Sequence, residues 1–179
     1  MINEKEMKME KILITGGTGS GKTSTATAFK MAREMGENFA YFAPTELLCY
    51  ESFVEYGGFG CRIDTSSVKI GAKNAKNFFG CYATSAKLDL STFKTVIIDE
   101  AHWVNNNDNH SYYIKKIVAE FKGNILLLTA NYNLFNIGSE KLVKLINSSG
   151  GDVLPSRIDC ILNVKTSYNI FHENRAFWV

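Results

Sequence analysis

The sequence lacks glutamine altogether, and it has only two prolines, four arginines among 20 basic residues and no long apolar run. Its apolar stretches fall well short of the roughly 18 residues that a membrane-spanning helix needs. Residues 1–11 are rich in charge and contain no apolar segment, so they do not form a secretory signal peptide. We therefore expect a cytoplasmic protein with no membrane partner.

Paired zinc-binding cysteines are also missing. Cys49, Cys61, Cys81 and Cys160 form no C-x-x-C pair, and none lies at zinc-ligand spacing from a histidine. Buried free thiols in a reducing cytosol are the expected state of these side chains. The formal net charge of +2 is too small to require a polyanionic partner by itself.

The sequence does contain 45% hydrophobic and 12% aromatic residues, enough for one domain with its own core. Apolar runs predict strands at residues 11–15, 39–45, 79–84, 95–99, 124–130 and 158–165. Amphipathic segments predict helices at residues 23–36, 46–58, 111–123 and 139–151. This alternation predicts an α/β fold: a mainly parallel sheet with helices on both faces.

The expected organisation is a single domain at residues 11–165. A short N-terminal extension at 1–10 precedes it, and a C-terminal tail at 166–179 follows it. Because the tail contains Phe171, Phe177 and Trp178, we expect it to pack on the domain. Ligands of such folds lie beyond the carboxyl ends of the strands.

Residues 16–23 read GGTGSGKT and match the phosphate-loop pattern G-x-x-x-x-G-K-[ST]. Glycines let the backbone N–H groups point at phosphate oxygens, and the helix that follows offers its positive end. Lys22 can reach the β- and γ-phosphates, while the Thr23 hydroxyl can bind Mg²⁺. The nucleotide-binding residues are therefore expected to be Gly16, Gly17, Thr18, Gly19, Ser20, Gly21, Lys22 and Thr23.

An acidic pair, Asp99 and Glu100, follows the apolar residues 95–98. Carboxylates at the end of so apolar a strand are costly unless they are paired or bind a metal. Asp99 is expected to hold Mg²⁺, directly or through water, and Glu100 to act as general base or to orient the attacking water. With Lys22 they form the predicted catalytic set.

These motifs resemble those of the first RecA-like domain of superfamily 2 helicases, especially the DEAH and viral branches. GGTGSGKT resembles motif I, APTELL (43–48) motif Ia, DEAH (99–102) motif II and LLLTAN (126–131) motif III. CYATSAKLDL (81–90) resembles the T-x-G-x-L segment that precedes motif II. The resemblance covers roughly residues 10–135 and implies a P-loop NTPase that uses ATP and Mg²⁺.

The resemblance also implies roles for residues outside the phosphate loop. Pro44, Thr45 and Thr84 would lie beside a single-stranded nucleic acid. His102 and Thr129 would couple the nucleotide state to the rest of the protein. The sequence departs from the family in three places: motif Ia lacks its arginine, Ser85-Ala86 replaces the glycine after Thr84, and Asn131 ends motif III.

The family's motor places ATP between two RecA-like domains, the second of which supplies an arginine finger. Only 48 residues follow Asn131, and neither Arg157 nor Arg175 lies in a family-like arginine motif. The absent glutamine excludes both the adenine-reading glutamine of DEAD-box proteins and a water-orienting glutamine. We therefore expect ATP binding with slow hydrolysis, completed by a protein partner or by self-association.

Two other functions fit parts of the pattern. A short P-loop nucleoside or nucleotide kinase would also have an acidic pair, but four scattered arginines suit its lid poorly. A non-catalytic, helicase-derived regulatory module would not need the intact Lys22 and Glu100. Lys69, Lys73 and Lys76 suit a solvated surface better than a phosphate track, and Asp108 and His110 suit a polar loop better than a metal site.

Overall fold

The computed structural model of the 179-residue chain describes residues 11–16, 21–105, 108–129 and 160–164. Within them lie three α-helices, α1 (Gly21–Glu34), α2 (Glu46–Tyr56) and α3 (Asn109–Glu120). Three 3₁₀ segments are η1 (Tyr82–Lys87), η2 (Leu90–Thr92) and η3 (Ala101–Asn105). The strands are β1 (Lys11–Gly16), β2 (Phe39–Ala43), β3 (Cys61–Asp64), β4 (Lys69–Ile70), β5 (Asn77–Cys81), β6 (Thr95–Ile98), β7 (Asn124–Thr129) and β8 (Cys160–Val164).

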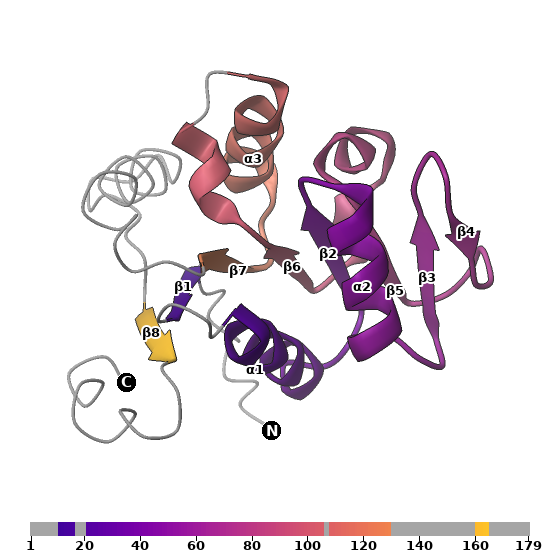
Figure 1. The fold of residues 1–179 in the computed structure, drawn as a ribbon, viewed down its shortest axis with the longest axis horizontal. Coiled ribbons are helices and arrows are strands. Elements are labelled where there is room, and N and C mark those ends of the chain that lie inside the picture. The colour runs from indigo at the N-terminus through magenta and orange to yellow at the C-terminus, as the bar shows by residue number, and fades with distance from the viewer. Residues whose placement is uncertain (1–10, 17–20, 106–107, 130–159, 165–179) are drawn as a thin grey trace, which may run out of the picture.

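The described strands form one sheet in the order β4-β3-β5-β2-β6-β7-β1-β8, which crosses the molecule in Figure 1. Every pairing is parallel except that of β4 with β3. Parallel strands end at the same edge of a sheet, here named the carboxyl edge. The ends of β1, β2, β5, β6 and β7 therefore lie along one line, and β7 separates β1 from β6.

Both faces of the sheet are covered, as the alternating pattern predicts (Figure 1). On one face, α1 and α2 pack through residues such as Phe29 and Cys49 onto Tyr41 and Phe79. On the other face, α3 packs through Ile114, Ile117 and Val118 onto the opposite side chains of the same strands. Because helices cover both faces of the sheet, a central strand needs apolar side chains on both of its faces. This explains why β2, β6 and β7 are buried along their whole length.

The segment at 79–84 differs from its predicted strand. Strand β5 ends at Cys81, and Thr84 lies in η1 instead. The Ser85 hydroxyl donates a 2.6 Å hydrogen bond to the Tyr82 carbonyl, and the Tyr82 hydroxyl donates to the carbonyls of the acidic pair. These side-chain bonds favour a tight 3₁₀ turn over further pairing, so the strand prediction was wrong at its end.

Two other regions were not anticipated. Residues 61–70 form the hairpin of β3 and β4, whose four- and two-residue strands are too short for a clear periodic signal. Residues 105–110 were expected to be a polar loop, yet Asn105 ends η3 and Asp108 caps α3 by accepting from the Ser111 N–H at 3.2 Å. The predicted helix at 139–151, the extension at 1–10 and the tail at 166–179 lie outside the described residues.

Two smaller predictions concern cysteines and membranes. In the described part of the chain, Cys49, Cys61 and Cys81 are free thiols, the first two buried and the third half-buried. No helix among the described residues is long and apolar enough to cross a membrane.

Candidate active site

The phosphate-loop sequence joins the carboxyl edge to the start of a helix. Strand β1 ends at Gly16 and α1 begins at Gly21, so the backbone of Lys22 and Thr23 lies in the first helical turn. That turn contains no acidic residue, which leaves the positive end of the helix dipole free for an anion. Residues Gly17, Thr18, Gly19 and Ser20 lie outside the described part of the chain.

Asp99 directly follows β6 at the same edge, and it is 6% exposed. Its Oδ2 accepts a 2.5 Å hydrogen bond from the Tyr41 hydroxyl, and its Oδ1 accepts a 2.8 Å bond from the Glu100 N–H. Burial raises the pKa of Asp99 to about 6, although the Tyr41 hydrogen bond opposes that rise. A carboxylate has about four lone-pair sites, so two remain for Mg²⁺ or its water ligands.

Glu100 has an unusual backbone conformation, with φ of +52°. A non-glycine residue in this left-handed region carries a conformational cost of about 1 kcal/mol or more. The Tyr82 hydroxyl bridges the carbonyls of Asp99 and Glu100 and thereby holds this turn in place. The Glu100 side chain stays half-buried, and burial raises its pKa, which favours a role as proton acceptor.

His102 lies between the acidic pair and β7. Its Nε2 is 3.2 Å from Oε2 of Glu100, and its Nδ1 is 3.3 Å from the Thr129 hydroxyl. Burial lowers the pKa of His102, so the ring is neutral near pH 7. Because a carboxylate only accepts, Nε2 carries the ring proton and Nδ1 accepts from Thr129. The predicted coupling residues therefore contact each other, and His102 also contacts Glu100.

The residues expected to contact nucleic acid also lie along the carboxyl edge. Pro44 is buried immediately after β2, and Thr45 is the exposed N-cap of α2, where its hydroxyl accepts from the Leu48 N–H at 3.2 Å. Thr84 is half-buried in η1, which follows the neighbouring strand β5. The structure thus groups these three residues near the acidic pair without showing them bound to anything.

Three residues of this network were missed at the level of sequence: Tyr41, Ser52 and Tyr82. The two tyrosines lie in apolar stretches and are typical of an ordinary core, while Ser52 follows Glu51 in a helix and is typical of a solvated face. A signal was nevertheless present, because a tyrosine buried among phenylalanines needs a partner for its hydroxyl. The run FAYFA contains one such tyrosine, and CYA contains the other.

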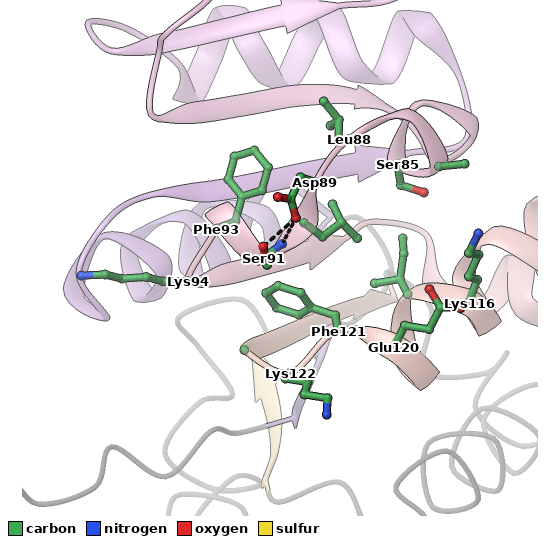
Figure 2. Close-up of a pocket in the computed structure, with 14 residues that line it drawn as sticks. Ser85, Leu88, Asp89, Ser91, Phe93, Lys94, Lys116, Glu120, Phe121 and Lys122 are labelled. Carbon is green, nitrogen blue, oxygen red and sulfur yellow. Dashed lines mark hydrogen bonds between the residues drawn. The ribbon is translucent and has the colours of Figure 1, made fainter.

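A separate cavity lies elsewhere in the described part of the chain. A groove of about 620 Å³, here named the α3 groove, runs between η1–η2 and the end of α3 (Figure 2). Figure 2 shows the Phe93 and Phe121 rings inside it, with Lys94 and Lys122 extending away. Lys94 precedes β6 and Gly123 precedes β7, so the groove reaches the amino edge of the sheet. It is therefore not the site of the phosphate-loop motif.

Other candidate sites receive no support from the described residues. No group of three or more His, Cys, Asp or Glu side chains in that part of the chain could hold a metal ion. Asp108 is engaged as a helix cap, and the His110 ring packs against Trp103 at 4.8 Å between ring centroids. Lys69 lies on the edge strand β4 with its side chain largely exposed, as a solvated lysine should.

A largely parallel sheet with a phosphate loop after β1 and an acidic pair after β6 defines the RecA-like class of ATP-binding folds. The sequence model for "DEAD/DEAH box helicase" matches residues 2–137, most of the chain, and the protein belongs to that family. Among solved structures, the Hef helicase domain of Pyrococcus furiosus matches with a TM-score of 0.62 and 20% identity. That match covers 91% of this chain and 36% of the Hef chain, so the protein spans about a third of it. A comparison with curated proteins gave no match.

Proposed function

We propose that this chain binds ATP with Mg²⁺ through one half of a nucleotide site and hydrolyses it slowly until an opposing surface completes that site. The observation that carries the proposal is the shared edge. The strand that leads into GGTGSGKT and the strand that presents Asp99 and Glu100 end at the same edge of the sheet, with only β7 between them. A polyphosphate bound at the loop would therefore extend toward the carboxylates.

Each group of residues in the proposed site has a separate role. Backbone N–H groups of Gly16 to Gly21 would hold the phosphates, and Lys22 would contact the β- and γ-phosphates. Thr23 and Asp99 would hold Mg²⁺. When bound, Mg²⁺ neutralises negative charge on the phosphate oxygens. Glu100 accepts the proton of the attacking water, since its raised pKa and its contact with neutral His102 suit that role.

The same proposal assigns a nucleic-acid surface to the carboxyl edge. Single-stranded RNA or DNA would run past Pro44, Thr45 and Thr84, while the contact between His102 and Thr129 would report the nucleotide state. We further propose a domain at residues 11–165, an extension at 1–10 and a tail at 166–179 that packs on the domain.

The opposing surface must come from outside the described residues. Arginine fingers accelerate phosphoryl transfer by about 10³-fold or more. In the described part of the chain, Arg33 is engaged with Glu37 and the Tyr56 carbonyl, and Arg62 stacks on Phe78 at 4.7 Å. Neither of these arginines is free to serve as the finger, so the proposed finger would come from the undescribed residues, another domain, a partner or a second copy.

The decisive experiment measures ATP binding and hydrolysis with and without single-stranded RNA and DNA. Lys22→Ala should weaken ATP binding at least tenfold, because the variant loses the phosphate-contacting ammonium group. Lys30→Ala is a suitable control, since Lys30 is an exposed residue of the same helix. Unchanged affinity in Lys22→Ala would overturn the phosphate-loop assignment.

The same assay separates the remaining alternatives. Family membership favours an NTPase over a nucleoside or nucleotide kinase, and ATP consumption that requires an added nucleoside would reverse that preference. Binding without any hydrolysis, even with a nucleic acid and a second copy present, would favour the regulatory module. Sizing the protein with an ATP analogue and an oligonucleotide would show whether self-association completes the site.

A further inference from the structure

The hydroxyl of Tyr41 has an unexpected position for a residue in the middle of a core strand. Tyr41 is 0% exposed, and its ring packs against Phe29 and Phe79 at 5.3 and 5.4 Å between centroids. A phenylalanine would satisfy that packing, as it does at Phe39 and Phe42 on the same strand. A buried hydroxyl is costly unless it is bonded, so its partners explain why a tyrosine can occupy this position.

Those partners are Asp99 and Ser52. The Tyr41 hydroxyl donates to Oδ2 of Asp99 at 2.5 Å and lies 2.9 Å from the Ser52 hydroxyl of α2. An ionised carboxylate cannot donate, so the single phenolic proton points at Asp99. The Ser52 hydroxyl must then donate to the tyrosine oxygen. The result is a directed chain from Ser52 through Tyr41 to Asp99, buried along its length because Ser52 is only 4% exposed.

This chain restrains one carboxylate oxygen, and the backbone restrains the other. Oδ1 of Asp99 accepts from the Glu100 N–H at 2.8 Å, while the Asp99 N–H itself donates to the Phe42 carbonyl at 2.9 Å. Two donors from different elements therefore fix the plane of the carboxylate. Residues that orient a metal-binding carboxylate in this way commonly alter metal affinity when they are changed.

We infer that Tyr41, held in place by Ser52, is a positioning residue that fixes the Asp99 carboxylate for magnesium-dependent nucleotide binding. The inference rests on the proposed function, and nothing in the four family-like motifs includes either residue. Tyr41 touches neither nucleotide nor metal in this role, because Asp99 stands between them. Loss of the hydroxyl should weaken magnesium binding at the site without disturbing the phosphate loop, which follows β1, three strands away from β2.

The experiment uses the full chain and compares Tyr41→Phe and Ser52→Ala with Tyr112→Phe. Tyr112 is 57% exposed on α3, so Tyr112→Phe removes the same hydroxyl from a surface position. ATP affinity is measured by calorimetry, first in EDTA and then across a magnesium titration, and the melting temperature of each variant is recorded in EDTA.

Tyr41→Phe should raise the magnesium concentration for half-maximal ATP binding roughly tenfold. Ser52→Ala should raise it about two- to threefold, since the tyrosine can still reach Asp99 but is less restrained. ATP affinity in EDTA should stay within about twofold of the parent chain for both, and Tyr112→Phe should match the parent in every measurement.

Three results would overturn the inference. An unchanged magnesium requirement in both Tyr41→Phe and Ser52→Ala would show that Asp99 needs no positioning. If ATP affinity fell as much in EDTA as it does in magnesium, the hydroxyl would support the fold and not the position of the carboxylate. If the parent chain binds ATP with no magnesium dependence, then the proposed function fails and the inference fails with it. Should Tyr41→Phe not fold, Ser52→Ala alone decides the question.

Discussion

The carboxyl edge around Asp99 and the α3 groove differ in whether they bury an ionisable side chain. The groove has a volume of about 620 Å³, and its charged side chains are exposed or half-buried. Asp89, for example, accepts from the N–H and hydroxyl of Ser91 two residues away and serves only as a cap for η2. At the carboxyl edge, by contrast, the buried Asp99 is held by residues far away in sequence. Tyr41, 58 positions away, donates to its carboxylate, and Tyr82, 17 positions away, donates to its backbone carbonyl.

The difference shows that a cavity by itself is a poor guide to function in this molecule. A buried acid with a raised pKa and long-range hydrogen bonds costs free energy, so the fold retains it only with compensation. The candidate site is therefore identified by its electrostatic cost and not by its size.

The largest expected difference between the two regions concerns hydrolysis. Glu100→Gln should lower the single-turnover rate of phosphate release by about 10²- to 10⁴-fold, since general-base catalysis is lost. Its ATP affinity should stay near that of the parent, because Glu100 does not hold the phosphates. The matched change in the groove, Glu120→Gln, should leave the rate unchanged. Equal rates in the two variants would remove Glu100 from the catalytic set.

The next largest effect concerns Asp99, whose replacement should lower the activity but raise the stability of the protein. In magnesium-free buffer, folded Asp99 keeps its proton up to about pH 6, whereas the unfolded chain releases it near pH 4. The folded state thus binds more protons between these values, and its stability falls as the pH rises from about 4 to about 6. Asp99→Asn should remove this slope and stabilise the protein by about 1–3 kcal/mol at pH 8.

Urea unfolding of Asp99→Asn in EDTA at pH 5 and pH 8 measures this stability change. The same variant should also lose magnesium-dependent ATP hydrolysis. The matched Asp89→Asn should alter neither property, because Asp89 is exposed and asparagine caps a helix about as well. A less stable Asp99→Asn protein would show that the carboxylate is not strained by burial.

The smallest effect is expected in the groove itself. Replacing Lys94, Lys116 and Lys122 together by alanine should change ATP affinity by less than about twofold and stability by less than about 1 kcal/mol. These lysines line the groove, but none contacts the acidic pair. A large loss of ATP affinity in the triple variant would show that the nucleotide binds in the α3 groove and not at the carboxyl edge.

Much of this arrangement could be predicted from the sequence, because it follows from periodicity and motif. The apolar runs of β2, β6 and β7 are buried on both faces and therefore carry a strong signal. Placing DEAH after one parallel strand and GGTGSGKT after another was enough to predict that both would reach one edge. The helices also began and ended within a few residues of their predicted bounds where the structure describes them.

The remaining features depend on contacts between distant residues. The residues next to Tyr41 in the sequence do not indicate that its hydroxyl bonds Asp99, because the pairing of β2 with β6 brings the two side chains together. The end of β5 was misplaced because Tyr82 favours a strand by composition, yet its hydroxyl bonds the turn at Asp99 and Glu100. Such tertiary hydrogen bonds override local preference, and only the folded chain reveals them.

Strand β7 has one further consequence for the choice of ligand. Adjacent strands lie about 4.8 Å apart, so the inserted strand sets the ends of β1 and β6 roughly 10 Å from each other. A nucleoside monophosphate anchored at the end of β1 is too short to cross that interval, whereas a triphosphate with a hydrated cation is long enough. If the nucleotide binds as proposed, the sheet order therefore sets the length of phosphate chain that can reach from the loop to the carboxylates, through geometry that no single side chain supplies.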